Sequence, residues 1–231
     1  MLDEAILFAT KAHEGQFRKG TKKPYIVHPL EVKDIVRTMT EDEEIICAAV
    51  LHDTIEDCKD VSEKTICTQF GERIAKLVAG ESEDKTKTWE ERKSATIEHL
   101  KNTSEELQMI ALADKLSNLR DIDRDYPIFG EELWLRFRMK NKDAMGWYYK
   151  NIRDVLRSGF EGQEAYAEYS QLVDKIFGKE PVGDVAGFFI TSSASEEEKI
   201  AAEKFIEWWY TGNEGTPIEE TGAGVWSTEL G

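Results

Sequence analysis

Cysteines are scarce in this sequence, and long apolar runs are missing. There are three cysteines, Cys47, Cys58 and Cys67, and no two of them form a Cys-x-x-Cys pair. An odd number without such a pair disfavours a disulfide framework or a cysteine zinc site, and reduced thiols are typical of cytosolic proteins. No apolar run approaches the roughly 18 residues that a membrane-spanning helix needs, and the acidic start MLDEAILFATKAHEG lacks the basic flank of a signal peptide. We therefore expect a soluble cytoplasmic protein without a membrane partner.

Basic residues are also in short supply, which argues against nucleic acid as a partner. The chain has 30 Lys and Arg residues against 46 Asp and Glu residues, a net charge of -16. General binding of nucleic acid relies on a basic footprint that this balance does not provide. The charge is uneven, however, because residues 11–37 hold seven basic and only three acidic side chains. Since the local field matters more than net charge for a small ligand, this stretch is expected to attract an anion.

Apolar residues recur with the period of an α-helix along most of the chain. Leu2, Ala5, Ile6 and Ala9, for example, follow i, i+3, i+4 spacing. Hydrophobic residues make up 40% of the sequence, enough for a core. Helices are predicted over residues 2–12, 29–39, 41–57, 62–70, 74–78, 90–100, 104–123, 141–157 and 163–177. No convincing alternating strand precedes residue 180, so we expect an all-α helical bundle.

A change of composition after residue 178 predicts two parts of the chain. Residues 1–178 hold the helical patterns, whereas PVGDVAGFFITSSAS is rich in glycine and serine and has one short β-prone run at 187–191. An acidic, tryptophan-rich helix is predicted over 196–210, before a tail rich in glycine and threonine. Residues 179–231 are therefore expected to form a short extension of mixed structure and unknown role.

The chemistry that stands out is a group of acids around one histidine. In LHDTIED, His52 is followed directly by Asp53 and then by Glu56 and Asp57. On a continuous helix, residues 52 and 56 share one face, and so do 53 and 57. Like charges this close destabilise one another unless a cation lies among them. The stretch therefore indicates a metal site, although a histidine–aspartate pair alone is more often a surface feature.

A metal site of this kind needs further ligands from other helices. His28, at the start of a predicted helix, and Asp114, in the apolar stretch ALADKLSNLR, are the best candidates. Two imidazoles with two carboxylates suit Mn, Fe or Zn better than Ca. If water fills open positions, the metal lowers its pKa and polarises a phosphoryl oxygen, as in hydrolases. The other histidines favour structural interpretations: His99 as a solvated helix residue and His13 as a residue that holds the following loop by hydrogen bonds.

These stretches resemble a known family. AHEGQFRKG, PYIVHPLEV, AAVLHDTIEDC and ALADKLSNLRDI, with SEDKTKTWEERK between them, resemble the HD-superfamily hydrolase domain of the RelA/SpoT proteins. The resemblance is closest to the small stand-alone, MESH-like type and covers roughly residues 2–177. It implies an all-α HD-domain fold and a hydrolase that uses Mn²⁺ to remove pyrophosphate from the 3′ position of ppGpp and pppGpp. No synthetase domain follows, so synthesis of these nucleotides is not expected.

The resemblance also implies roles for individual residues. The metal ligands would be His28, His52, Asp53 and Asp114. The attacking water would be positioned or deprotonated by Glu56 and Asp57. The nucleotide would be contacted by Arg18, Lys19 and Asn118. Lys85 is a weaker candidate for a phosphate contact, and Tyr148 is assigned to core packing in preference to a base pocket. Ser117 departs from the family, because many relatives have a bulkier polar or aromatic residue there.

Two other functions fit the same residues. One is an HD phosphohydrolase for another nucleotide, such as a nucleoside monophosphate or NADPH. The other is a nucleotide-sensing or partner-binding module without turnover, which the acidic, tryptophan-rich extension would suit. The acids Glu56 and Asp57 together with the Arg18–Lys19 pair favour hydrolysis of ppGpp over the first, and the complete set of metal ligands counts against the second.

Overall fold

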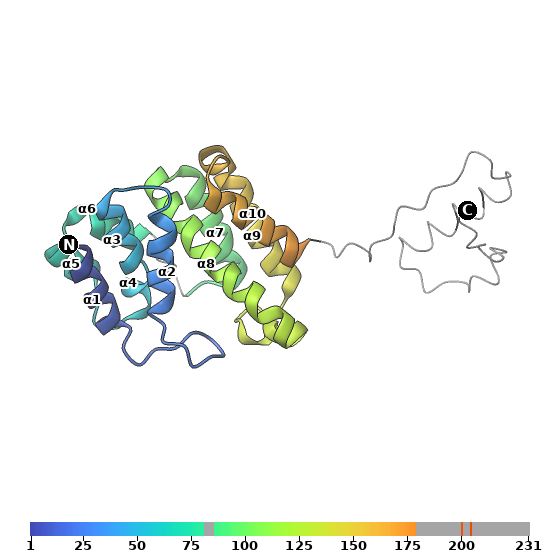
Figure 1. Ribbon diagram of the computed structural model, residues 1–231, viewed down its shortest axis with the longest axis horizontal. Coiled ribbons are helices and arrows are strands. Elements are labelled where there is room, and N and C mark those ends of the chain that lie inside the picture. Colours follow the sequence, from blue (N-terminus) through green and yellow to red (C-terminus); the bar gives the residue numbers. More distant parts are fainter. Residues whose placement is uncertain (81–85, 179–199, 201–203, 205–231) are drawn as a thin grey trace. The chain divides into compact units, whose positions relative to one another are not determined.

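The computed structural model describes residues 1–80 and 86–178, together with positions 200 and 204 (Figure 1). This part of the chain is helical, and its one β-type pairing is an isolated bridge between Phe17 and Pro24. The all-α prediction is therefore confirmed. The helices are α1 (Leu2–Ala12), α2 (Val27–Val36), α3 (Glu43–Leu51), α4 (Thr54–Asp57), α5 (Glu63–Phe70), α6 (Glu72–Gly80), α7 (Trp89–Asn102), α8 (Glu105–Phe129), the 3-10 helix η1 (Gly130–Arg136), α9 (Lys142–Phe160) and α10 (Glu164–Phe177).

Helix boundaries follow the capping residues in the sequence. The side chains of Ser62 and Thr88 each accept a hydrogen bond from the backbone N–H three residues later, at the starts of α5 and α7. Such contacts satisfy N–H groups that have no partner inside the helix. Gly71 ends α5 with a φ of 95°, a backbone conformation that other residues rarely adopt. Among the described residues, no helix is both long enough and apolar enough to cross a membrane.

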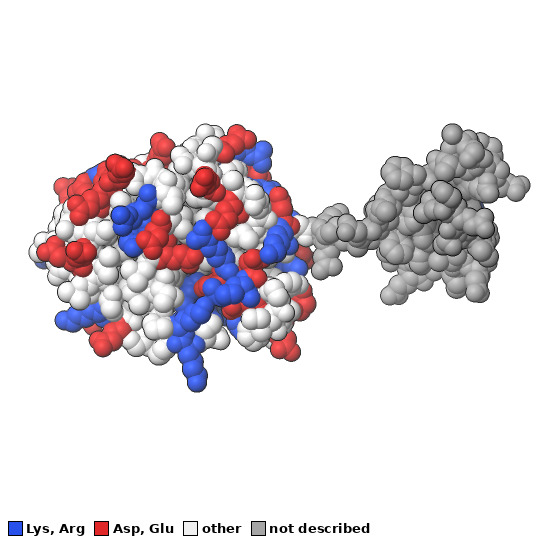
Figure 2. Space-filling view, viewed as in Figure 1, with Lys and Arg blue, Asp and Glu red and all other residues white. Residues whose placement is uncertain are grey.

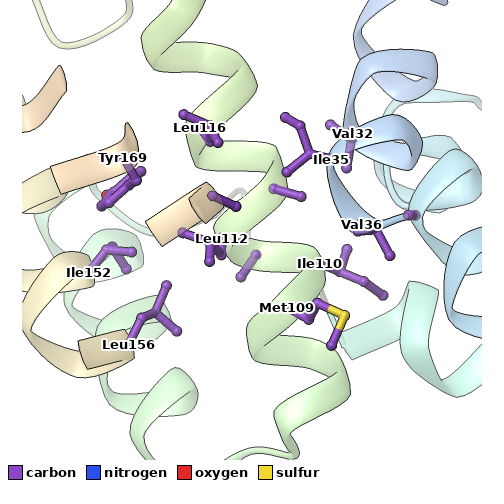
Figure 3. Packing of buried hydrophobic residues seen from close by; sticks show 14 of the residues in the cluster. Val32, Ile35, Val36, Met109, Ile110, Leu112, Leu116, Ile152, Leu156 and Tyr169 are labelled. Carbon is purple, nitrogen blue, oxygen red and sulfur yellow. The ribbon is translucent and has the colours of Figure 1, made fainter. Parts of the chain in front are cut away.

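Helix α8 runs through the middle of the bundle and divides the core into two halves. Figure 3 shows Ile110 on the side of α2, whereas Leu112 and Leu116 extend toward α9 and α10. On the α2 side, the packing residues include Val32, Ile35 and Val36, and on the other side they include Ile152, Leu156 and Tyr169. Removing this apolar surface from water is the main stabilising contribution to the fold. It also fixes α8 relative to α2, so that polar residues on these two helices have defined positions.

The structure corrects the predicted helix over 41–57. The chain forms two helices, α3 and α4, with a turn at His52 and Asp53 between them. At Asp53 the backbone has a φ of -90° and a ψ of -6°, outside regular helical values. The hydroxyl of Thr54 donates a 2.7 Å hydrogen bond to the carbonyl oxygen of Leu51, which satisfies the end of α3. Residues 52 and 56 therefore do not share the face of one continuous helix.

The end of α8 also differs from the prediction. The helix continues past residue 123 to Phe129 and includes Pro127, and η1 follows it without having been predicted. Apart from positions 200 and 204, residues after Gly178 lie outside the described part. The boundary at 178, the β-prone run and the tryptophan-rich helix therefore stay predictions.

Candidate metal centre and surrounding pocket

The four predicted metal ligands lie together although three separate stretches supply them. His28 is on α2, His52 and Asp53 form the turn between α3 and α4, and Asp114 is on α8. The Nε2 atom of His28 lies 3.1 Å from Oδ1 of Asp114 and 3.6 Å from Oδ2 of Asp53. The Nε2 atom of His52 lies 3.0 Å from Oδ2 of Asp53 and 3.9 Å from Oδ1 of Asp114. Ligand atoms of His28, His52 and Asp114 all lie within 4.8 Å of one another, so this buried cluster is able to bind a metal ion.

The hydrogen bonds of the His52 ring fit a bound cation. Its Nδ1 lies 2.8 Å from the carbonyl oxygen of Ala49, which can only accept, so Nδ1 carries the proton. In the neutral ring the lone pair of Nε2 then faces the carboxylates. This Nε2 atom is buried and has no hydrogen-bond partner among the described residues. A nitrogen lone pair beside two carboxylate groups is unfavourable unless a proton or a metal ion lies between them.

The charges of the cluster are strongly coupled. Burial acts to lower the pKa of His52, but the nearby carboxylates of Asp53 and Asp114 outweigh it and raise that pKa to about 9. Burial lowers the pKa of His28, which Asp114 offsets only in part. For the carboxyl groups burial acts in the opposite direction, yet His52 holds the pKa of Asp53 well below its usual range, and Lys115 and His28 do the same for Asp114. Without metal, the two carboxylates thus favour a second proton on the His52 ring, at Nε2. A divalent cation would take the place of that proton.

Tyr25 is a member of this cluster that the sequence analysis did not identify. Its hydroxyl donates a 2.6 Å hydrogen bond to Oδ2 of Asp53 and lies 3.5 Å from Oδ2 of Asp57. Burial and the charge of Asp53 raise the pKa of Tyr25 well above its usual value, so the hydroxyl stays a donor. Its place three residues before His28, in the loop stretch PYIVHP, was the available signal.

A pocket of about 510 Å³ opens over the cluster and is rich in basic side chains. Acids also line it, among them the predicted Glu56 and Asp57. Figure 2 shows Lys and Arg side chains gathered in the middle of one face of the helical part. The lining holds seven basic and six acidic residues, so a divalent cation bound at the cluster would leave the pocket positively charged and suited to a ligand with several negative charges. Its basic lining residues are Arg18, Lys19, Arg92, Lys93, Lys115, Arg136 and Arg138.

The three residues predicted to contact the nucleotide all line this pocket, and two of them are hydrogen-bonded to each other. Arg18 donates a 2.8 Å hydrogen bond to Oδ1 of Asn118 and an equally short one to Oδ2 of Asp121. Asn118 in turn donates to Oδ1 of Asp114 at 2.7 Å. Lys19, the next residue in the loop, is exposed at the pocket. Arg18 is thus held beside the metal cluster by side chains on α8.

The remaining polar candidates have the places expected of structural residues. His13 is buried, and its Nδ1 lies 2.9 Å from Oε1 of Gln16, whose amide reaches the carbonyl oxygen of Asp57 at 3.0 Å. This contact holds the loop as predicted. His99 is exposed on α7. Tyr148 is buried in the core, as predicted, and also lines the pocket. Lys85 lies outside the described residues.

The loop that carries Arg18 depends on Gly20. This glycine has a φ of 70°, and a Cβ there would lie 2.6 Å from Cδ of Arg136. Arg136 is itself held by a 3.0 Å ion pair with Asp125 and by contact with the Phe129 ring. We expect Gly20→Ala to destabilise the protein by about 1–2 kcal/mol from backbone strain and by about 1 kcal/mol more from the displaced arginine. Urea unfolding measures the loss.

Gly15 offers a matched control for that substitution. It has a similar φ of 77°, but a Cβ there would meet no atom within 4 Å. Gly15→Ala should therefore show the cost of the backbone alone. Equal losses in free energy of unfolding for the two variants would contradict a role of the Arg136 contact.

Comparisons with known proteins identify relatives of this chain. The HD domain family (HD_4) matches residues 5–128. A Xenopus tropicalis protein named guanosine-3′,5′-bis(diphosphate) 3′-pyrophosphohydrolase MESH1 is 40% identical over 71% of this chain and 87% of its own length. The protein of the same name from Danio rerio is 38% identical over 55% of this chain and 72% of its own length.

Solved structures agree with the sequence matches. A metazoan ortholog of SpoT, described as hydrolysing ppGpp, superimposes with a TM-score of 0.61 at 30% identity and covers 76% of this chain and 93% of that one. The family match spans more than half of the sequence and contains all four residues of the metal cluster. This chain belongs to the HD domain family.

Proposed function

We propose that this protein is a metal-dependent hydrolase that removes the 3′-pyrophosphate from ppGpp and pppGpp and releases GDP or GTP with pyrophosphate. The observation that carries the proposal is the convergence of two histidines and two aspartates at a pocket lined by seven basic residues. The relatives named above carry this activity in their names. We further propose that the reaction takes place in the cytoplasm on the free nucleotide.

We assign the metal ligands to His28, His52, Asp53 and Asp114, and the metal to Mn²⁺. Nitrogen and carboxylate ligands in equal number suit this ion, and burial of the cluster restricts the number of waters that reach it. When bound, such a cation lowers the pKa of a water and polarises a phosphoryl oxygen. The Nδ1 contact of His52 with Ala49 would hold that ring with Nε2 toward the ion.

Glu56 and Asp57 are assigned to the attacking water. Both line the pocket and follow Asp53 by about one helical turn in α4. They would orient the water and accept its proton as its oxygen forms a bond to phosphorus. The bond between that phosphorus and the 3′ oxygen breaks, and the nucleotide leaves as a 3′-hydroxyl after taking up a proton.

Arg18, Lys19 and Asn118 are assigned to the substrate. Arg18 and Lys19 carry fixed positive charge at the pocket, where it offsets the charge of the two diphosphate groups. Asn118 bridges Asp114 and Arg18, so it would couple the position of the substrate to that of the metal. The aromatic lining residues, such as Trp89 and Tyr148, provide apolar surface for the base.

A product assay tests this function. Protein loaded with Mn²⁺ is expected to convert ppGpp to GDP and pyrophosphate, with metal content measured on the same sample. A His52→Ala, Asp53→Ala double variant gives the background. A panel of nucleoside monophosphates and NADPH tests selectivity. Faster turnover of a panel member than of ppGpp would replace the proposed substrate, and tight ppGpp binding without product would indicate a sensing module.

A further inference from the structure

The two histidines of the metal cluster are oriented in different ways. His52 donates to a backbone carbonyl, as many metal-binding histidines do. The Nδ1 atom of His28 instead lies 2.9 Å from the hydroxyl oxygen of Ser117 on α8. That hydroxyl donates a 2.8 Å hydrogen bond to Oε2 of Glu31, one turn after His28 on α2. His28 and Ser117 are both almost fully buried, so water does not replace this contact.

The direction of these hydrogen bonds follows from the groups involved. A serine hydroxyl has one proton, and an ionised carboxylate can only accept. Because the proton of Ser117 goes to Glu31, the Ser117 oxygen accepts from Nδ1–H of His28. The neutral His28 ring is thus protonated at Nδ1 and keeps its Nε2 lone pair, which lies toward Asp114 and Asp53. This is the tautomer that a metal ligand needs.

Glu31 is itself fixed from the other side. Arg120 donates to Oε1 of Glu31 at 3.0 Å and makes two 2.6 Å hydrogen bonds with the carboxylate of Glu168 on α10. The guanidinium holds one oxygen of the Glu31 carboxylate, and the second oxygen accepts from Ser117. A continuous series of hydrogen bonds thus connects Glu168 on α10 with Arg120 and Ser117 on α8 and with Glu31 and His28 on α2.

We propose that Ser117 and Glu31 are positioning residues that hold His28 in the tautomer and orientation in which its Nε2 binds the metal ion. The inference rests on the proposed role of His28 as a ligand. The small side chain of Ser117 fits between the buried His28 ring and Glu31 and contacts both. Neither residue touches the reacting atoms.

Titration of Mn²⁺ alone into the metal-free protein tests the proposal. Loss of an outer hydrogen-bond partner typically weakens metal binding about 10–100-fold, and we expect this for Ser117→Ala. Ser117→Thr retains the hydroxyl and should restore affinity to within about threefold of wild type. Ser170→Ala removes a buried hydroxyl without a hydrogen-bond partner among the described residues and should leave Mn²⁺ affinity unchanged.

Glu31→Ala supplies a second, independent variant, since the Glu31 side chain is 35% exposed and its loss leaves Arg120 paired with Glu168. If the two residues act as one unit, the double variant binds Mn²⁺ within about threefold of Ser117→Ala alone. Should Ser117→Ala not fold, Glu31→Ala alone decides, with weakened binding supporting the proposal and wild-type binding overturning it.

Three results would overturn the proposal: wild-type affinity in Ser117→Ala, a Ser117→Thr variant as weak as Ser117→Ala, or losses that multiply in the double variant. The proposed function fails separately. If Ser117→Ala weakens Mn²⁺ binding but the wild-type protein leaves ppGpp intact, the positioning role is supported and only the substrate assignment is overturned.

Discussion

Replacing Asp53 with asparagine is expected to lower the rate of ppGpp hydrolysis more than about a hundredfold, because the loss of a direct ligand exceeds the usual effect of an outer partner. Oδ2 of Asp53 lies 3.0 Å from Nε2 of His52 and 3.6 Å from Nε2 of His28, and it accepts a 2.6 Å hydrogen bond from Tyr25. Asparagine has nearly the same shape, so it can still accept from Tyr25. It lacks the negative charge that holds a cation between two imidazoles. Steady-state kinetics at saturating Mn²⁺ and ppGpp measure the loss.

A neighbouring aspartate provides the control for this substitution. Asp60 is exposed, lies just after α4 and does not line the pocket. Asp60→Asn removes the same charge from the same region and should leave turnover unchanged. The Asp53 variant should also retain its far-ultraviolet circular dichroism spectrum, since no core side chain changes. Activity within tenfold of wild type in a folded Asp53→Asn protein would remove Asp53 from the set of ligands.

The convergence of the four proposed ligands could be predicted because buried histidine and aspartate side chains at those positions need a partner. An aspartate in the apolar stretch of α8 and a histidine at the start of α2 are costly to bury alone. That cost indicates that each has a partner. The partners Tyr25, Ser117 and Glu31 could not be found in this way, because a tyrosine in a loop, a serine and a partly exposed glutamate on helices are ordinary residues there. Their roles depend on distances between α2, α4 and α8 that only the packed bundle determines.

Helix positions were predictable where an apolar period and a cap agree. The cap at Ser62 and the stretch up to Phe70 are an example, and α5 ends at that residue. The break at His52 and Asp53 was missed because the apolar residues of α3 continue directly into LHDTIED without a glycine or proline. There the tertiary contacts of Asp53, together with the hydroxyl of Thr54, override the local preference for helix.

Helix α8 connects the stability of the bundle with the metal cluster. Asp114, Ser117 and Asn118 follow i, i+3, i+4 spacing and lie on its polar face. Leu112 and Leu116 lie on the opposite side, toward α9 and α10 (Figure 3). The same packing that stabilises the fold therefore sets where the polar face lies relative to His28 on α2. A cavity under α8 should affect the whole molecule before it affects the chemistry.

Leu112→Ala is accordingly expected to lower the free energy of unfolding by about 2–5 kcal/mol, the usual range for truncating a fully buried leucine. Leu112 has no exposed surface, so the change removes apolar contacts and leaves a cavity between α8 and its neighbours. Leu7→Ala is the matched control, because Leu7 is 71% exposed on α1 and should change stability by less than about 0.5 kcal/mol. Urea unfolding of the metal-free proteins compares the two.

The same variant separates stability from catalysis. Below its unfolding transition, folded Leu112→Ala protein retains every ligand, so its turnover at saturating Mn²⁺ should stay within a few-fold of wild type. As temperature rises, its activity should fall in parallel with the folded fraction, at a lower temperature than in Leu7→Ala. A large loss of turnover in fully folded Leu112→Ala protein would instead mean that the cavity shifts Asp114, and that the metal cluster tolerates less movement of α8 than its outer hydrogen bonds imply.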